Sequence, residues 1–462
     1  MSRKTVAKEL RRIAGDENVL TDKADLATYA YDAAVLDKVM PAIVVRPTTS
    51  EALGRVVGLC NANRLALTVR GAGTNLSGGT IPLPGGVVVV TNGLNRILEI
   101  NTEDLYARVQ PGVVTARLAA AVEAQGLFYP PDPGSQAVST LGGNVAENAG
   151  GLRGLKYGVT RDYVMGLDFF DVDGGLVKTG GRTVKCVSGY NLTGLMVASE
   201  GTLGVFNEMT LKLIPLPAYR KSMMAVFGTM GQASEAVAAI IAQRVVPATL
   251  EFMDNFTIRA VESYSQAGLP LDAGALLLVE CDGHRGQVEE EAAKVEAICG
   301  ELGATSIRVA RDDAERDKVW EARRAALSAL AKVKPTTVLE DATVPRSKIP
   351  AMIRALEEIS RKYDLTIGTF GHAGDGNLHP TILTDRRDAR EWERVEAAIA
   401  DIFEQALALG GTLSGEHGIG TAKSCFMEKE TSRATIRYSH KIKAALDPNN
   451  ILNPGKIIGE RP

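Results

Sequence analysis

The sequence lacks the patterns that mark several large classes of protein. Its five cysteines are scattered along 462 residues and form no Cys-x-x-Cys pair, which argues against an iron–sulfur cluster held by this chain alone and against a disulfide framework. The net charge is -3 and no basic run stands out, so the composition gives no support for a nucleic-acid partner. No apolar stretch approaches the roughly 18 residues of a membrane span, and the N-terminus has no apolar signal core. We therefore expect a soluble, cytoplasmic protein.

Glycine, in contrast, is abundant. The chain has 47 glycines, concentrated in residues 71–79, 134–158, 178–204 and 371–420. Glycine is needed where the backbone takes a positive φ or comes close to a ligand, so this density predicts a large bound cofactor. A chain of this length is also too long for one small core, and two or three domains are expected.

Histidine is scarce, and its distribution is uneven. Three of the five histidines lie in two short glycine-rich segments. Imidazole suits zinc and similar divalent ions, and it also moves protons near neutral pH. Two imidazoles, from His372 and His379, together with the Glu416 carboxylate would leave an open position on the ion, which is typical of a catalytic site. His417 directly follows Glu416 and is the candidate base.

The chain divides into three parts by its patterns. Residues 1–217 mix helical and strand-like segments and end at a proline-marked break, which indicates an α+β domain. Residues 218–420 alternate strand-like and helical stretches, with little glycine before the histidine motifs, and predict an antiparallel sheet with helices on one face. Residues 421–462 end in turn-forming sequence. The expected fold class is α+β.

Several element boundaries can be predicted. Residues 3–30 have helical spacing, and Ser50 is the expected N-cap of a second helix. A strand is expected at Leu65–Arg70, directly before the first glycine segment, and another at Leu365–Phe370. The glycines of residues 371–379 disfavour a helix, so a curled loop is expected to bring the two histidine rings together.

The segment Arg70–Gly79 has the composition of a phosphate cradle. It presents successive small residues with backbone N–H groups, and Thr74 and Ser77 offer hydroxyls as further donors. Leu76 breaks the Gly-x-Gly-x-x-Gly fingerprint of a dinucleotide fold, and no Gly-Lys-Ser/Thr sequence of a P-loop follows. Taken alone, a segment of this kind is more often an ordinary turn.

Four further segments favour the phosphate cradle over the ordinary turn. Pro131–Gly134, Ser139–Gly151, Tyr157–Asp162 and Ser199–Val205 follow in order, and the set resembles the FAD-binding domain of the vanillyl-alcohol oxidase and p-cresol methylhydroxylase superfamily. From about residue 25 to Ile458 the chain resembles, more narrowly, the FAD-linked 2-hydroxy-acid dehydrogenases. These include the glycolate oxidase FAD subunit and the D-lactate and D-2-hydroxyglutarate dehydrogenases. The motifs His-Ala-Gly-Asp-Gly-Asn-Leu-His and Gly-Glu-His-Gly-Ile-Gly are specific to that family.

The resemblance implies a two-subdomain FAD-binding domain at residues 1–217, a cap domain with the substrate and metal groups at 218–420, and a segment, 421–462, that returns to the FAD domain. Because the pyrophosphate loop contains no histidine, FAD is expected to bind without a covalent link. The residues that the resemblance assigns to the cofactor are Arg70, Gly71, Ala72, Gly73, Thr74, Asn75, Leu76, Ser77, Gly78, Pro131, Thr140, Gly142, Gly143, Asn144, Asn148, Gly150, Gly201, Gly204, Val205 and Asn453.

The resemblance also gives the histidine motifs a chemistry. A divalent ion, expected to be Zn²⁺ although Mn²⁺ and Fe²⁺ accept the same ligands, would chelate a 2-hydroxy acid and acidify its hydroxyl. His417 would remove the hydroxyl proton while the Cα hydride moves to FAD. Arg323, in a Trp-x-x-Arg motif, would bind the substrate carboxylate. Asp375 is expected to stabilise a turn.

Two positions bear on the substrate. Family members that act on a dicarboxylate carry a lysine and an asparagine where this chain has Leu339 and Thr381. A short monocarboxylate, D-lactate or glycolate, is therefore favoured over D-2-hydroxyglutarate, which remains an alternative. Since the chain has no cluster motif, a separate iron–sulfur subunit, an electron-transferring flavoprotein or a quinone is the expected electron acceptor. A partner subunit could hold the protein at a membrane.

Other functions stay open at this point. One is a non-redox FAD enzyme that resembles alkylglycerone-phosphate synthase. The others are a flavin-free metal hydrolase and a catalytically silent subunit of a larger complex. Flavin that is reduced by a hydroxy acid would distinguish the dehydrogenase from all three.

Overall fold

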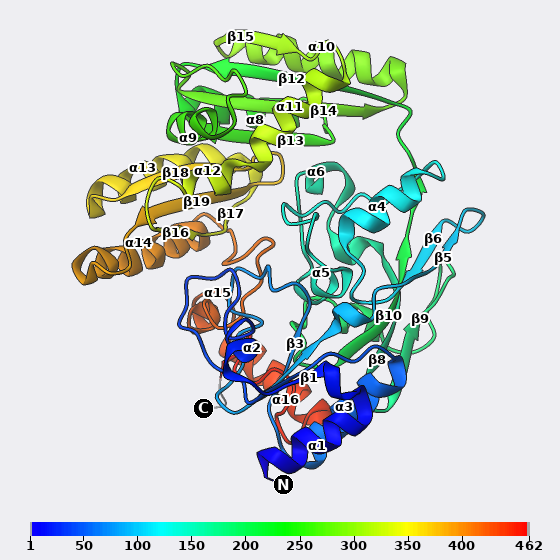
Figure 1. The fold of residues 1–462 in the computed structure, drawn as a ribbon. Coiled ribbons are helices and arrows are strands. Elements are labelled where there is room, and N and C mark those ends of the chain that lie inside the picture. The colour runs from blue at the N-terminus through cyan, green and yellow to red at the C-terminus, as the bar shows by residue number, and fades with distance from the viewer. Residues whose placement is uncertain (1, 460–462) are drawn as a thin grey trace. The chain divides into compact units, whose positions relative to one another are not determined.

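The computed structural model describes residues 2–459, which form two compact units. The first unit contains the chain up to Gly150, Val159–Leu216 and the residues from Glu416 onward. The second unit contains Gly151–Gly158 and Pro217–Gly415. The path of the chain through each unit can be followed by colour in Figure 1.

A small mixed sheet lies in the N-terminal part of the first unit. Its strand order is β1-β2-β4-β3, with β2, β4 and β3 parallel and β1 antiparallel to β2. The central strand β4 consists of four buried valines, as is typical of a parallel strand covered on both faces. The strands and helices of this part are β1 (Val19–Leu20), β2 (Ile43–Val45), β3 (Leu67–Arg70), β4 (Val87–Val90), α1 (Arg3–Ala14), α2 (Lys23–Ala27) and α3 (Ser50–Ala62).

Two helix boundaries differ from the sequence prediction. The helix expected over residues 3–30 ends at Ala14, because Gly15 takes φ +94° and its N–H closes the last turn on Arg11 O. Thr49, not Ser50, caps α3, since the Thr49 hydroxyl accepts the N–H of Ala52 at 3.2 Å.

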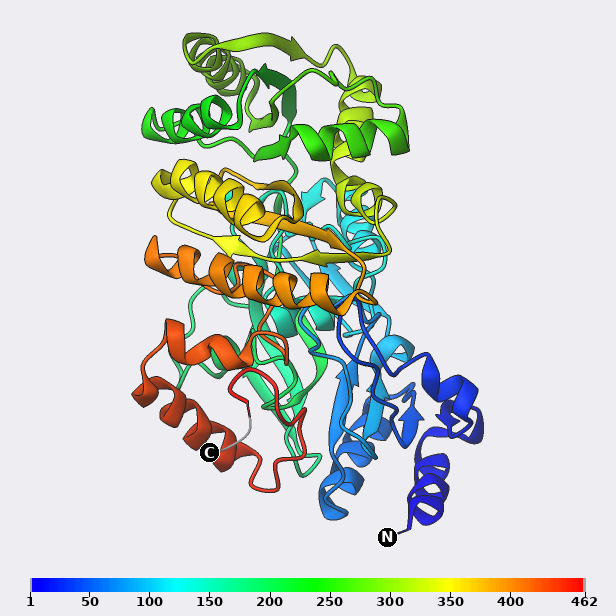
Figure 2. The same ribbon diagram turned by 90° about the vertical axis from the view of Figure 1, so that its left-hand side faces the viewer.

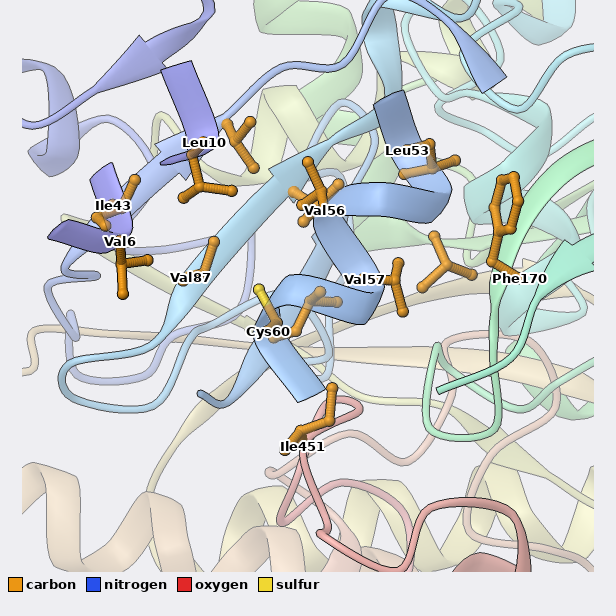
Figure 3. Packing of buried hydrophobic residues seen from close by; sticks show 14 of the residues in the cluster. Val6, Leu10, Ile43, Leu53, Val56, Val57, Cys60, Val87, Phe170 and Ile451 are labelled. Carbon is orange, nitrogen blue, oxygen red and sulfur yellow. The ribbon is translucent and has the colours of Figure 1, made fainter. Parts of the chain in front are cut away.

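The core of this part joins segments that are far apart in the sequence. Figure 3 shows Leu10 of α1, Val56 of α3 and Val87 of β4 packed together with Phe170 and Ile451. All five side chains are buried. The C-terminal residues are therefore part of the first hydrophobic core.

A second sheet of the first unit is antiparallel, with strand order β5-β6-β10-β8-β9. Helices α4 and α5 contribute Leu118 and Val145 to a buried cluster that includes Val109 and Met209 of the sheet. The elements are β5 (Ile97–Asn101), β6 (Tyr106–Val109), β8 (Val164–Phe170), β9 (Leu176–Gly180), β10 (Val205–Lys212), α4 (Thr115–Glu123), α5 (Leu141–Glu147), α7 (Leu192–Met196) and the paired short strands β7 (Leu127–Phe128) and β11 (Ile214–Pro215).

The C-terminal segment is fixed to β3. It contains α15 (Met427–Glu430) and α16 (Arg433–Leu446). Beyond α16, Leu67 N–H donates to Ile451 O and Asn453 N–H donates to Leu67 O, both at 2.7 Å. Buried Lys443 donates to Asp447 Oδ2 at 2.5 Å and to Leu452 O at 2.6 Å. These bonds hold the tail beside the strand that leads into the glycine-rich loop.

The second unit is built on one antiparallel sheet with strand order β15-β12-β14-β13-β18-β19-β16, and β17 also pairs with β19. Its strands are β12 (Tyr219–Phe227), β13 (Thr249–Asp254), β14 (Ala275–Gly283), β15 (Ala304–Val309), β16 (Thr336–Leu339), β17 (Ala342–Thr343), β18 (Thr366–His372) and β19 (Asn377–Thr384). Its helices are α6 (Gly154–Tyr157), α8 (Met230–Ala242), α9 (Asn255–Ser265), α10 (Arg285–Glu301), α11 (Asp313–Arg324), α12 (Ala326–Leu330), α13 (Ile349–Tyr363) and α14 (Ala389–Ala408).

Helices cover this sheet in two groups. One row contains α10, α8, α13 and α14, and Figure 2 shows α13 and α14 side by side in yellow and orange. Met224 and Val226 of β12 pack with residues of α9, α11 and α12. The alternate residues Ala225 and Phe227 point to the opposite face and are also buried, so both faces of the strand are covered. The sequence predicts helices on one face; the structure adds a second group on the other face. The predicted α+β fold class with an antiparallel cap sheet is confirmed.

The second unit also includes a short piece of chain that the sequence analysis placed in the first domain. Leu152 joins the buried cluster of the second sheet. Lys156 Nζ and the Tyr157 hydroxyl bind the Asp282 carboxylate at 2.6 and 2.8 Å. These contacts assign Gly151–Gly158 to the second unit, which ends at Gly415 and not at residue 420.

In the described part of the chain, no helix combines the length and the apolar character that crossing a membrane would require.

Candidate active site

His372 and His379 lie on the two strands of a hairpin. In the β18–β19 register His372 pairs with Asn377, and His379 pairs with Phe370. Since side chains alternate along a strand, both histidines point to the same face. Their ring centroids are 5.0 Å apart, and both residues are buried, with 6% and 3% of their surface exposed. The rings thus lie together, but strand pairing and not the expected curled loop positions them.

The turn between these strands requires glycine. Gly376 takes φ +91°, and a Cβ added there would collide with Val344 O. Asp375 Oδ1 accepts the N–H of Asn377 at 3.2 Å, the turn contact that the sequence predicts for this carboxylate.

A buried carboxylate links His372 to Arg323. Glu251, on β13, accepts a hydrogen bond from His372 Nδ1 at 2.7 Å, and its other oxygen lies 2.5 Å from Arg323 Nη2. Burial raises the pKa of Glu251, but the charges and hydrogen bonds of His372 and Arg323 outweigh it and hold that pKa below its usual range. Glu251 is therefore ionised, and it connects two residues that the sequence analysis singled out.

Arg323 has donor capacity beyond this ion pair. The residue is 4% exposed, and its guanidinium lies 4.8 Å from the centre of the Phe370 ring. Among residues 2–459, no hydrogen-bond acceptor meets its Nε. A buried donor of this kind fits a bound anion.

A second buried carboxylate, Asp341, lies beside His379. One oxygen of Asp341 and a ring nitrogen of His379 are within 4.8 Å. Asp341 Oδ2 also accepts the Ser414 hydroxyl and the Gly415 N–H, both at 2.8 Å. Asp341 therefore fixes the segment that leads to Glu416.

Glu416 and His417 belong to the first unit. Glu416 Oε1 and His417 Nε2 are 3.6 Å apart. Gly150, predicted to line the cofactor, makes room for this carboxylate, since a Cβ added there would lie 2.6 Å from Glu416 Oε2. The four predicted metal and base residues thus form two pairs, one in each unit.

The donor set of the second unit suits a divalent ion. Two neighbouring imidazoles with adjacent carboxylates provide the nitrogen and oxygen ligands that Zn²⁺, Mn²⁺ and Fe²⁺ accept.

The glycine-rich loop after β3 has the properties of an anion nest. Within the described chain, the backbone N–H groups of residues 72–76 have no protein acceptor. Asn75 Oδ1 accepts the N–H groups of Ser77 and Gly79 at 2.9 and 2.7 Å, which fixes the curve of the loop. Gly73 and Gly78 take φ +77° and +80°. These N–H groups fit a pyrophosphate.

Thr140 lies under this loop, at the N-cap of α5. Its hydroxyl is buried and has no hydrogen-bond partner in the part of the chain that is described, and a Cβ added at Gly71 would collide with it. The close approach of Gly71 and the available hydroxyl both fit a bound cofactor.

Other predicted cofactor residues have roles in packing. A Cβ at Gly142 would lie 2.6 Å from Pro111 Cβ, and one at Gly204 would lie 2.8 Å from the Phe169 ring. Asn144 donates to Thr115 Oγ1 at 2.7 Å. Asn148 ends α5 in the left-handed region and accepts the Arg161 N–H. Pro131 and Val205 are buried, Gly143 has room around it, and Gly201 faces Val69.

Asn453 connects three parts of the first unit. Its Nδ2 donates to Gly79 O and Glu200 O at 2.8 and 2.7 Å, and its Oδ1 accepts the Thr68 hydroxyl. It therefore lies at the base of the glycine-rich loop.

Two buried carboxyl groups beside the Gly418–Gly420 turn were missed. Glu200 accepts the N–H groups of Ile419 and Gly420 at 2.7 and 2.8 Å, yet burial raises its pKa to about 7. Burial, followed by the charge of Glu200, raises the pKa of Glu147 as well. Both residues stand inside glycine motifs, so their position could have identified them. Glu251 was harder to find, because it lies in a short strand between the apolar residues Leu250 and Phe252 and belongs to no motif.

Two family descriptions match the chain. The "FAD binding domain" family covers residues 41–180, and "FAD linked oxidases, C-terminal domain" covers residues 216–457. The second match alone spans more than half of the chain.

Curated relatives agree with these matches. The chain is 49% identical to glycolate oxidase subunit GlcD of Bacillus subtilis, over 100% of this chain and 98% of that protein. It is 36% identical to D-lactate dehydrogenase of Anaerostipes hadrus, over 92% and 91%. A solved structure of p-cresol methylhydroxylase superposes with a TM-score of 0.83 at 18% identity, over 99% and 97% of the two chains, which supports the fold. The chain belongs to the family of FAD-linked oxidoreductases that includes glycolate oxidase subunit GlcD and D-lactate dehydrogenase, as its motifs predicted.

Proposed function

We propose that this FAD-linked oxidoreductase oxidises a short 2-hydroxy acid, D-lactate or glycolate, to the 2-oxo acid. His372, His379 and Glu416 hold a divalent ion, with Zn²⁺ as the first candidate, and His417 is the base. The main support for the proposal is the buried pair of histidine rings, which lie 5.0 Å apart. Glu251 accepts a hydrogen bond from Nδ1 of His372, as a carboxylate behind a metal-binding histidine commonly does.

Chain connectivity supports Glu416 as the third ligand. Gly415 is fixed by Asp341, the carboxylate beside His379. Glu416 is the next residue, and consecutive Cα atoms are about 3.8 Å apart. Two imidazoles and one carboxylate leave open positions for the oxygens of a substrate.

The residues divide the chemistry as follows. Arg323 binds the substrate carboxylate through the guanidinium edge that Glu251 does not occupy. His417 takes the hydroxyl proton at Nε2, the nitrogen next to Glu416. A bound divalent ion would supply charge that acidifies the substrate hydroxyl. FAD, when bound, accepts the Cα hydride.

The first unit holds FAD in this proposal, and the second unit supplies the histidine pair and Arg323. The N–H groups of residues 72–76 bind the pyrophosphate, and Thr140 adds a hydroxyl donor. Because residues 70–79 include no histidine, the flavin is bound without a covalent link.

The family relationship and two side chains support the substrate class. The compared relatives are named for glycolate and D-lactate. Leu339 and Thr381, the positions that favour a monocarboxylate, are register partners in the β16–β19 pair. An apolar side chain at one of them offers no partner to a second carboxylate.

The electrons leave through a separate acceptor. The scattered cysteines provide no cluster motif in this chain. An iron–sulfur subunit, an electron-transferring flavoprotein or a quinone would serve, and the name of the GlcD relative, which describes a subunit, is consistent with the first of these.

Anaerobic absorbance spectra during titration with D-lactate, L-lactate, glycolate and D-2-hydroxyglutarate test this function. The flavin band is expected to bleach with D-lactate or glycolate and to return when a dye acceptor is added. A flavin band that none of the four acids bleaches would contradict the proposed substrate class.

A further inference from the structure

We infer that Glu251 is a positioning residue that orients two site residues at once, His372 and Arg323. The inference rests on the proposed function, because it concerns the residues that would hold the ion and the substrate carboxylate. It adds a residue that no sequence motif of the chain contains.

Strand pairing puts Glu251 opposite His372. In the β13–β18 register, Phe252 pairs with Gly371 and Met253 with Phe370. Extending this antiparallel register by one residue pairs Glu251 with His372. The contact therefore follows from the backbone of the sheet and does not depend on a mobile side chain.

Each oxygen of Glu251 has its own partner. Oε1 accepts the His372 Nδ1 hydrogen at 2.7 Å, and Oε2 lies 2.5 Å from Arg323 Nη2. The Glu251 side chain is fully buried, and its neighbours on the strand, Leu250 and Phe252, are buried apolar residues. A buried carboxylate costs free energy unless cations and donors compensate it, and these two residues provide both.

The hydrogen bond decides which nitrogen of His372 binds the ion. With Nδ1 donating to Glu251, the lone pair is on Nε2, and the carboxylate makes that nitrogen more basic. The same carboxylate fixes the guanidinium of Arg323 and leaves its Nε for a bound anion. One residue thus sets the orientation of a metal ligand and of a carboxylate-binding group.

Zinc affinity tests this role. The purified full-length protein, cleared of metal with a chelator, would be titrated with Zn²⁺ against a chromogenic chelator. E251Q removes the charge and keeps the shape, and we expect it to bind Zn²⁺ about 10- to 100-fold more weakly, as is typical when the outer partner of a metal-binding histidine is lost.

The matched control is D254N on the same strand. Asp254 is also buried, but its carboxylate binds the backbone N–H groups of Thr257 and Thr369. D254N is expected to bind Zn²⁺ like the wild type. Flavin content and thermal midpoint would establish that each variant is folded.

A second variant keeps the test decisive if E251Q does not fold. E251D retains the charge and withdraws the carboxylate by one methylene, and it is also expected to weaken Zn²⁺ binding. If wild type binds Zn²⁺ and the folded Glu251 variant binds it equally well, the positioning role is overturned while the proposed function stands. If wild type binds no Zn²⁺, the proposed metal site is overturned, and this inference with it.

Discussion

At the scale of single residues, most of the chemistry-bearing side chains could be predicted, but their carboxylate partners could not. His372, His379 and His417 stand out because histidine is rare in this chain and all three lie in glycine-rich segments. Glu251 and Asp341 have no such context. Their importance comes from strand register and from the fixed Gly415 N–H, both of which depend on tertiary pairing. Sequence patterns record local order and miss contacts of this kind.

Arg323 illustrates the same limit. The Trp-x-x-Arg motif singles it out as a carboxylate-binding group, and the structure places its guanidinium beside a carboxylate of the protein itself. The motif identifies the residue, whereas the ion pair with Glu251 depends on how α11 packs against the sheet.

The Leu339–Thr381 pair gives a prediction for substrate choice. The two residues face each other across β16 and β19, and Thr381 lies on the same strand face as His379, two residues away. The double variant L339K/T381N is expected to raise kcat/KM for D-2-hydroxyglutarate relative to D-lactate by about 10- to 100-fold, because hydrogen bonds to a charged group contribute roughly 1.5–3 kcal/mol.

Steady-state kinetics with both acids checks this prediction. T337K is the control, since it adds a lysine to the same strand, two residues before Leu339. An unchanged preference in the double variant, with flavin content like that of the wild type, would show that this pair does not select the substrate.

At the scale of elements, several strands and helices were predicted within a few residues, whereas the helix expected over residues 3–30 ends at Ala14. The strand expected at Leu365–Phe370 is β18, which continues to His372. This extension matters, because it converts the expected loop into a hairpin. Glycines at 371, 374 and 376 favour irregular backbone locally, but pairing with β13 and β19 overrides that preference.

The N-terminus of α9 provides a pH prediction. Asp254 Oδ1 accepts the Thr257 N–H and Oδ2 accepts the Thr369 N–H, while burial raises the pKa of Asp254 from 3.8 to about 6. A raised carboxyl pKa means that the folded protein holds the proton more tightly than the unfolded chain. Stability from this group is therefore complete below pH 3.8 and is lost as the pH rises through about 6.

D254N removes this titration and leaves a capping oxygen. Between pH 4 and pH 6 the free energy of unfolding of wild type should fall relative to D254N by about 2 kcal/mol. Urea unfolding of both proteins across this range measures the difference between their free energies of unfolding. Other titrating groups contribute equally to both proteins and cancel in this difference. A difference that does not vary with pH would contradict the buried, shifted carboxyl.

At the scale of the whole molecule, the division into a FAD-binding part and an antiparallel cap sheet follows from the order of motifs. The exact boundaries of the two units do not follow from the motifs. Gly151–Gly158 stands amid first-unit sequence but packs in the second unit, because Leu152 and Lys156 find their partners there. The chain passes from the second unit back to the first at Gly415–Glu416. This boundary falls inside a continuous glycine motif, and no change in composition marks it.

The boundary at Gly415–Glu416 separates the candidate base, His417, from the histidine pair along the chain. His372 and His379 belong to one unit, and His417 belongs to the other. We propose that these residues act on one substrate, with His417 as the base.

Single-turnover flavin reduction tests this claim most directly. Wild type, H417A and H284A would be mixed anaerobically with whichever of D-lactate or glycolate reduces the wild-type flavin; His284 is an exposed histidine at the start of α10 and serves as the control. H417A is expected to keep its flavin band and to lose about 100- to 10,000-fold in reduction rate, the usual contribution of a general base, while H284A reduces like the wild type. Reduction of H417A at the wild-type rate would show that His417 is not the base.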